Sequence, residues 1–299
     1  MIEILRNPTI DFIAKRKYGF IFSAVVMVIS LALIFVRGPN FGIDFTGGAL
    51  LQIKFDQAIT TGALRNSLSK IGRGSAQIQS LGVAKTEYIV RVAGENPEGF
   101  APALKTVLSE DFPDNAREFL REETVEPKIG KELLSKTIWA VIIALVLILI
   151  YVSFRFDYRF GTAAVIALFH DAIFTLGVLV LTQRELSIVV VGALLTIIGY
   201  SINDSIVISD RIREKYNKMR REAYNVVLNT GLNETLSRTV LTVGTTLLAV
   251  IALLVFGGTV IADFAFTLLI GFLIGTYSSI FILAGIVSVW EEKFPKKKK

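Results

Sequence analysis

Long apolar runs alternate with polar stretches along the chain, and this pattern predicts its architecture. A helix needs about 17–25 apolar residues to cross the hydrocarbon core of a bilayer. The sequence contains runs of that length that are almost free of charge, and each is too long for a strand of a soluble core. We therefore predict six transmembrane helices. They fall at about residues 18–36, 138–154, 161–181, 187–208, 239–256 and 264–289.

Segment 37–136, between the first two runs, has the patterning of a small water-soluble domain. Residues 49–55 are apolar and strand-like, 76–81 and 87–93 alternate as strands do, and 118–125 forms a last strand; helical spacing occurs at 60–71 and 100–108. The resulting order, β-α-β-β-α-β, is that of the ferredoxin-like split motif. The segment has no His, no Cys and no nucleophile beside a base, so we expect a binding or scaffolding role and no enzyme activity.

Composition supports a membrane protein of this kind. Hydrophobic residues make up 53% of the chain and the mean hydropathy is +0.59, more apolar surface than a soluble core can bury. The chain has no cysteine, which excludes disulfide scaffolds and thiolate metal sites. We predict no cofactor and no bound metal, because the lone histidine, His170, has no evident partner ligands.

The distribution of charge predicts the orientation. Lys and Arg are concentrated in 1–17, 155–160, 209–238 and 290–299, whereas segment 37–136 has equal numbers of acidic and basic residues. By the positive-inside rule both termini are cytoplasmic and segment 37–136 lies outside. The net charge of +6 then reflects topology and contact with the lipid bilayer, and we predict no nucleic-acid partner.

Outside segment 37–136, we divide the chain into three parts. Residues 1–36 combine a cytoplasmic N-terminus with the first helix, which we interpret as an uncleaved anchor because its apolar run exceeds that of a signal peptide. Residues 137–290 hold the other five helices. Within them, 209–238 is predicted to be a basic amphipathic helix on the cytoplasmic membrane surface. Residues 291–299 form a basic tail to which we assign no function.

A glycine-rich run, Gly42–Gly48, stands where the first helix meets the external segment. Gly42, Gly47 and Gly48, with Asp44 between them, favour a tight structural turn, since glycine permits positive φ and close backbone approach. A phosphate-binding loop is the alternative. No helix is predicted immediately after Gly48, so the turn is favoured.

Ionisable residues within the predicted spans are the strongest functional signal. His170 and Asp171 lie inside the third run, and Asp204 lies in the inner half of the fourth. Arg238, at the start of the fifth, is placed at a similar depth to Asp204. Charges in the membrane are costly and usually functional, which favours a proton or ion relay over a packing ion pair. We predict Asp204 as the proton-carrying group and Arg238 as its charge partner. His170 and Asp171 are either relay or packing elements.

The fourth run also has a small, polar face. Gly192, Thr196, Gly199 and Asn203 recur at helical spacing, so another helix can approach closely there. Asn203 adjoins Asp204 and is included among the candidate relay residues.

Several motifs in these regions resemble SecF, the family of accessory subunits of the bacterial Sec protein-export machinery, within the SecD/SecF group of the resistance-nodulation-division superfamily. The resemblance spans nearly the whole chain. It is carried by GIDFTGG at 42–48, Phe-His-Asp at 169–171, GYSINDSIVISDRIRE at 199–214 and SRTVLTVGTT at 237–246. One departure is Glu126, where the family usually has glycine between valine and proline.

The resemblance implies an arrangement and a role. Six helices with a ferredoxin-like periplasmic domain between the first two form half of a pseudo-twofold unit, whose other half is SecD. Together SecD and SecF act with the SecYEG channel to pull preproteins outward, using proton flow across the bacterial inner membrane. In the family, the aspartate of Ile-Asn-Asp and the arginine of Ser-Arg-Thr are implicated in proton movement. They correspond to Asp204 and Arg238.

Other functions are less consistent with the sequence. A small-molecule exporter of the same superfamily usually carries both six-helix halves and a larger external domain. A purely structural scaffold leaves the buried charges unexplained. ATP-driven transport is disfavoured because the sequence contains no Gly-x-x-x-x-Gly-Lys-Ser/Thr loop.

Overall fold

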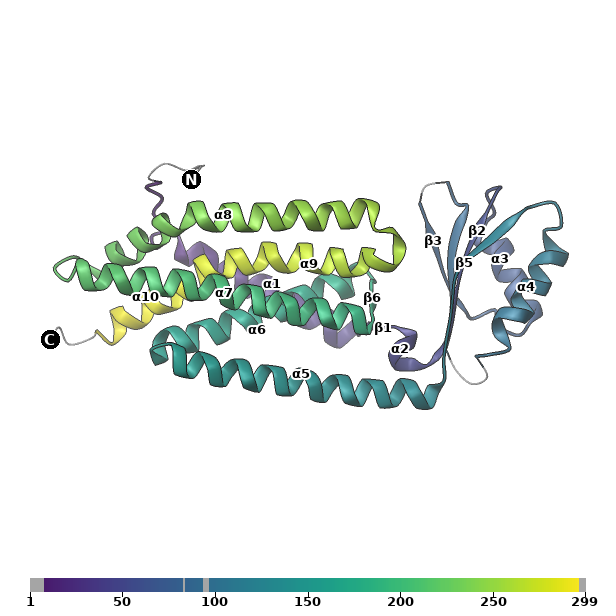
Figure 1. Cartoon of the computed structure of the whole chain (residues 1–299), viewed down its shortest axis with the longest axis horizontal. Coiled ribbons are helices and arrows are strands. Elements are labelled where there is room, and N and C mark those ends of the chain that lie inside the picture. Colours follow the sequence, from purple (N-terminus) through teal and green to yellow (C-terminus); the bar gives the residue numbers. More distant parts are fainter. Residues whose placement is uncertain (1–7, 83, 94–96, 296–299) are drawn as a thin grey trace. The chain divides into compact units, whose positions relative to one another are not determined.

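The chain folds into two units, which we describe separately. The structure is a computed structural model that describes residues 8–82, 84–93 and 97–295, excepting the side chains of 259 and 260. One unit is a sheet domain, Phe41–Ala140, and the other is a helical bundle made of Met1–Asn40 and Val141–Lys299 (Figure 1). The last four residues of the predicted basic tail, 296–299, lie outside the described residues.

The sheet domain has the predicted ferredoxin-like order. Its four-stranded sheet has the strand order β3-β4-β2-β5, with antiparallel neighbours. Helices α3 and α4 pack on one face of the sheet over a core that includes Leu51, Tyr88 and Leu104 (Figure 1). The elements are β2 (Gly48–Phe55), α3 (Thr61–Lys70), β3 (Gln77–Leu81), β4 (Glu87–Val92), α4 (Phe100–Asp111) and β5 (Arg117–Val125).

The glycine-rich run forms a one-turn helix followed by a tight turn into β2. Gly42 caps the one-turn helix α2 (Ile43–Thr46), where Asp44 occupies the first turn. Gly47 and Gly48 follow with φ of 69° and 135°, values that residues with a side chain rarely adopt. A Cβ on Gly47 would overlap the backbone of Pro127, and one on Gly48 the carbonyl oxygen of Val92. The glycines therefore let β2 begin in close contact with its neighbours.

Helices α3 and α4 are tied together by Asp111, which gives the sheet domain a pH dependence. Its carboxylate accepts hydrogen bonds from Lys70 Nζ and, at 2.6 Å, from Ser67 Oγ. The Lys70 bond, followed by the Ser67 bond, lowers the pKa of Asp111 below its ordinary value of 3.8. The ionised Asp111 therefore stabilises the fold at pH values above the pKa that this residue has in the unfolded chain. The stabilisation is lost as the pH falls through the lower pKa of Asp111 in the folded chain.

We therefore expect Asp111→Asn to reduce hydrogen-exchange protection of α3 and α4 modestly at pH 7. The reduction should shrink as pH falls to about 3, below the pKa of about 3.9 of an unfolded Asp. Asp114→Asn, on the loop that follows α4, serves as the control. A deficit in the Asp111 variant of equal size at both pH values would contradict this account.

The helical bundle confirms the six predicted spans. Six helical stretches of the described chain are long and apolar enough to cross a membrane. They are α1 (Arg16–Arg37), α5 (Pro127–Arg155), α6 (Tyr158–Leu181), α7 (Ile188–Lys218), α8 (Tyr224–Phe256) and the continuous run of α9 (Gly258–Ser278), the π-helical turn η1 (Ser279–Leu283) and α10 (Ala284–Lys293). Two-residue strands, β1 (Asn40–Phe41) and β6 (Glu185–Leu186), complete the elements.

Helix α9 is central to the bundle, where it contacts α6, α7 and α8. Gly271 explains its closeness to α7, because a Cβ there would overlap the side chain of Ile197. One turn later, a Cβ on Gly275 would touch Ser201. These glycines, four residues apart, provide the small-residue surface through which membrane helices approach closely.

The prediction of a separate surface helix over 209–238 is wrong. Helix α7 continues to Lys218 and α8 starts at Tyr224, so the two helices form a hairpin with a short connection. Arg211 Nε donates to Glu234 at 2.6 Å, and Gly231 packs against Ile212. The basic residues therefore lie on extensions of two spans, because α7 and α8 keep an apolar, contacting face beyond the predicted helix end.

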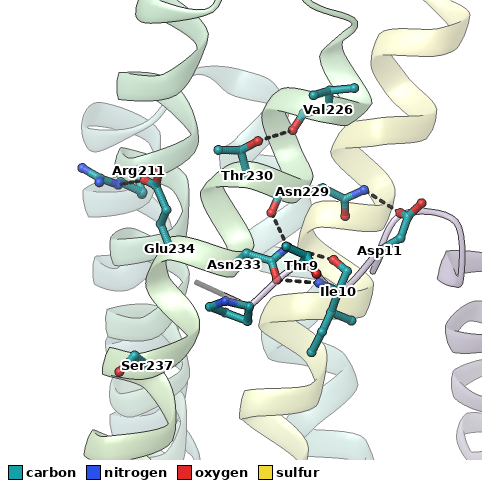
Figure 2. Close-up of a pocket in the computed structure, with 11 residues that line it drawn as sticks. Thr9, Ile10, Asp11, Arg211, Val226, Asn229, Thr230, Asn233, Glu234 and Ser237 are labelled. Carbon is teal, nitrogen blue, oxygen red and sulfur yellow. Dashed lines mark hydrogen bonds and ion pairs between the residues drawn. The ribbon is translucent and has the colours of Figure 1, made fainter. Parts of the chain in front are cut away.

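Two asparagines of α8 hold the N-terminal segment of the bundle (Figure 2). Asn233 accepts from the backbone N–H of Ile10 at 2.9 Å and donates to the carbonyl of Ile10 at 2.8 Å. Asn229, one turn earlier, accepts from the N–H of Ile13 at 3.1 Å and donates to Asp11 at 2.5 Å. The start of the described chain is thus anchored to α8 before α1 begins.

Candidate functional site

Two carboxylates are buried inside the helical bundle. Asp171 on α6 is fully buried and Asp204 on α7 is 9% exposed. Within residues 8–82, 84–93 and 97–295, neither forms an ion pair with a Lys or Arg. Both are instead surrounded by neutral hydroxyl groups. This is an unusual environment, since buried carboxylates are commonly paired with a cation or a metal.

Asp171 is held by groups from three helices. Its Oδ2 accepts hydrogen bonds of 2.7 Å from Ser201 Oγ on α7 and from Ser278 Oγ on α9. Its Oδ1 lies 3.1 Å from Nδ1 of the neighbouring His170. The imidazole ring stacks on Phe174 and lies beside Tyr277, which fixes its orientation. Both carboxylate oxygens therefore have partners.

Asp204 has a matching pair of hydroxyl donors. Thr239 Oγ1 on α8 donates to Oδ1 at 2.9 Å, and Ser279 Oγ donates to Oδ2 at 2.5 Å. All three side chains are buried. The carboxylate of Asp204 thereby links α7 to α8 and to the last membrane-spanning stretch.

The two carboxylate sites share a serine pair. Ser278, the last residue of α9, donates to Asp171, and Ser279, the first residue of η1, donates to Asp204. Consecutive helical residues point about 100° apart, so one residue pair can reach aspartates on two different helices. The π-helical turn begins at Ser279, and such turns often occur at functional sites.

These hydroxyls can serve either protonation state of the carboxyl groups. Ser278 Oγ also lies 3.1 Å from the carbonyl of Gly275, and Ser279 Oγ lies 3.0 Å from that of Thr276. A hydroxyl can donate to a carboxylate, or donate to the backbone while it accepts from a protonated carboxyl. The arrangement can therefore bind and release protons without loss of hydrogen bonds.

The structure places the predicted relay residues differently. Asp204, Asp171 and His170 are buried in the cluster just described. The side chain of Arg238, the residue before Thr239, is exposed and forms no ion pair with Asp204 among the described contacts, but its cation is near enough to interact electrostatically with that carboxylate. Asn203 is likewise exposed and lies outside both hydrogen-bonded groups of the described chain. The role of Arg238 as charge partner stays a prediction.

The small, polar face predicted on α7 is exposed. A Cβ on either Gly192 or Gly199 would meet no atom of the described chain within 4 Å. Helix α8 has a second set of exposed small or polar residues at the same spacing. The exposed residues are Gly192, Thr196, Gly199 and Asn203 on α7, and Arg238, Thr242, Thr245 and Ala249 on α8. We call these eight residues the open polar face.

Four hydroxyl residues of the site were not predicted: Ser201, Thr239, Ser278 and Ser279. Each lies within or beside an apolar run, where single hydroxyls often bond to their own helix backbone. The Ser278–Ser279 doublet was the available signal, because two adjacent hydroxyls in a span leave at least one directed toward another helix. Among the described residues, no three His, Asp or Glu side chains are grouped closely enough to hold a metal ion.

Sequence comparisons identify related proteins. Residues 105–293 match the family described as "Protein export membrane protein SecD/SecF, C-terminal", and residues 32–59 match the "SecD/SecF GG Motif". The protein translocase subunit SecF of Calditerrivibrio nitroreducens is 42% identical over 292 residues, which cover 96% of each chain. That of Desulfurispirillum indicum is 43% identical, over 97% of this chain and 94% of the relative.

Solved structures agree with these matches. SecDF from Thermus thermophilus, a translocon-associated membrane protein, superposes with a TM-score of 0.86 at 38% identity. The match covers 96% of this chain but 39% of the SecDF chain. SecDF in its super-membrane-facing form superposes over 97% of this chain with a TM-score of 0.72. The present chain thus corresponds to about two fifths of the length of SecDF.

Proposed function

The chain belongs to the SecF family of protein translocase subunits, and on this basis we propose that it couples proton movement through Asp204 to protein export. It is a multi-pass membrane protein. In this proposal it lies in the bacterial cytoplasmic membrane with both termini in the cytoplasm and the sheet domain on the opposite side. It acts with SecD and the SecYEG channel on preproteins in transit, as a transport component and not as an enzyme.

The environment of Asp204 is the observation that carries this proposal. A charged side chain in the membrane interior costs about 2.5–3.5 kcal/mol on insertion scales. Asp204 is 91% buried and its described partners are the neutral hydroxyls of Thr239 and Ser279. Addition of one proton cancels the charge; one hydroxyl can then accept a hydrogen bond from the carboxyl O–H while the other still donates to the carboxyl C=O. The structure around Asp204 therefore suits a group that alternates between charged and neutral forms.

Proton exchange at Asp204 provides a means to move helices. The carboxylate form attracts the donors on α8 and η1, whereas the neutral form lets Ser279 return to the carbonyl of Thr276. A change in protonation thus alters the packing of α7 against α8 and η1. Arg238 adjoins Thr239 on α8, so a modest displacement of that helix brings its cation toward Asp204. The experiment that tests the role of Asp204 opens the Discussion.

The open polar face supports a second six-helix subunit as partner. A surface that contacts lipid chains is ordinarily apolar, while small and hydroxyl residues favour contact between helices. The face carries Arg238, whose exposure to lipid would be costly. SecDF, which the chain matches over 39% of its length, supplies the remaining part within one chain. We propose that SecD covers this face.

We expect Thr196→Leu, on this face, to weaken copurification with SecD about tenfold, since added bulk in a packed interface costs about 1–3 kcal/mol. Thr162→Leu on α6 is the matched control. Both threonines are exposed, and each donates to a backbone carbonyl four residues earlier, at 2.8 Å and 2.7 Å. Equal recovery of SecD with the two variants would contradict the proposed interface.

A further inference from the structure

A cavity of about 490 Å³ lies at the end of the bundle where α7 and α8 connect. It is bounded by the connection between α5 and α6, the last turns of α7 and the start of α8. Its lining includes Arg155, Arg213 and Asp157, together with Ser209 of α7. Charged groups at its edge indicate that water reaches it.

Two buried polar atoms of the helical bundle have no hydrogen-bond partner among the described residues. One is Oγ of Ser209, which is 3% exposed and belongs to the cavity lining. The other is Nε2 of His170, beside Asp171. An unsatisfied buried polar group costs about 1–3 kcal/mol, so such groups are normally paired with protein or water. Their need for a partner points to water within the helical bundle.

A line of serines connects these two places. Ser201, Ser205 and Ser209 recur every four residues on α7, on one face of the helix, and all are buried. Neighbouring hydroxyls are about 6 Å apart along the axis, a gap that one bridging water spans. Ser201 ends the line with its hydrogen bond to Asp171.

Helix α6 also runs from this cavity to Asp171. Phe160 lines the cavity, and Asp171 lies three turns further on the same face. The residues between them at that helical spacing are Ala164 and Ala167, both buried. Both alanines pack in a hydrophobic cluster that includes Ile208 of α7, and their small side chains let the two helices lie close together beside the serines.

We propose that Asp171 is a second proton-exchanging carboxyl, reached by water from this cavity along Ser209, Ser205 and Ser201. A proton from this water adds to the Asp171 carboxylate and gives a neutral carboxyl, and its return to water restores the carboxylate. The adjacent Ser278 and Ser279, which donate to Asp171 and Asp204 respectively, then couple the protonation state of Asp171 to that of Asp204. The inference rests on the proposed proton coupling for its biological role, but the water path can be tested without it.

Cysteine accessibility provides this test, because the chain has no native cysteine. Ser209→Cys and Ser205→Cys are prepared in the complex with a cysteine-free SecD, and 2-aminoethyl methanethiosulfonate is added from the α7–α8 connection side of vesicles without a proton gradient. Ile208→Cys is the matched control, since Ile208 is equally buried and lies within a hydrophobic cluster. We expect Ser205→Cys to react at least about tenfold faster than Ile208→Cys, equivalent to about 1.4 kcal/mol in the barrier. Equal rates would overturn the proposed path.

A second measurement tests whether the path carries protons. Ser205→Val fills the path with apolar atoms, whereas Ser205→Thr keeps the hydroxyl with a similar volume. We expect Ser205→Val to slow proton uptake into vesicles about tenfold, equivalent to about 1.4 kcal/mol in the barrier. Ser205→Thr should retain most of the wild-type rate of uptake. Equal uptake by both variants would refute proton passage along the serines. That failure is distinct from failure of the proposed function, which would appear as unchanged activity of Asp204→Asn.

Discussion

Asp204→Asn should abolish the stage of protein translocation that depends on the proton-motive force, with a loss of at least about 100-fold. This is the range that removal of a proton-transferring group typically costs. The amide is nearly the same size as the carboxyl and still accepts a hydrogen bond from Thr239 or Ser279, so the helices stay packed. What the substitution removes is the ability to gain and lose a proton.

The measurement is preprotein translocation into inverted membrane vesicles, with and without a proton gradient. Copurification of the variant with SecD shows that the subunit is folded and assembled. Asp114→Asn is the matched control, because it makes the same chemical change at an exposed residue of the sheet domain, outside the described hydrogen bonds of both carboxylates. Wild-type late-stage translocation by Asp204→Asn would refute the assignment of Asp204.

Gly48→Ala should destabilise the sheet domain by about 3 kcal/mol or more, since backbone strain alone costs about 1–3 kcal/mol and forced overlap adds to it. Gly48 has φ of 135°, and a Cβ there would overlap the carbonyl oxygen of Val92 on the adjacent strand. The neighbouring atom belongs to the backbone, so a side-chain rotation cannot relieve the overlap.

Gly62→Ala is the matched control for this prediction. Gly62 lies in α3, where a Cβ would approach no atom closer than Thr60 Oγ1 at 3.9 Å. Alanine should stabilise that helix by about 1 kcal/mol. Hydrogen exchange of β2 and β4 reports both effects. Protection in Gly48→Ala equal to that in Gly62→Ala would contradict the role assigned to the turn.

Much of the fold could be predicted because its signals are local. The apolar run at 49–55 and the alternation at 87–93 identify strands that the structure places at Gly48–Phe55 and Glu87–Val92. The transmembrane helices could be predicted equally well, since the length and hydropathy of each apolar run determine them. The exception was 209–238, where charge suggested a surface helix. Apolar residues such as Ile212, on the buried face of α7, extend the span and override that pattern.

The site was only partly predictable because it depends on how helices pack. Asp171 and Asp204 were identified by the cost of their burial. Their partners Ser278 and Ser279 follow from the register of α9 and η1 against α6 and α7, which no short sequence pattern specifies. Arg238 was predicted as the charge partner of Asp204. The hydrogen bond in the structure comes from the next residue, Thr239, and the role of Arg238 stays a prediction.

The central claim is that Asp204 alternates between carboxylate and carboxyl during transport. Infrared difference spectroscopy of the reconstituted complex with SecD, recorded with and without a proton gradient, observes this directly through the C=O stretch of a protonated carboxyl. The account predicts a difference band that appears with the gradient and is lost in Asp204→Asn but kept in Asp114→Asn. A spectrum in which Asp204→Asn retains every carboxyl band of the wild type would contradict it.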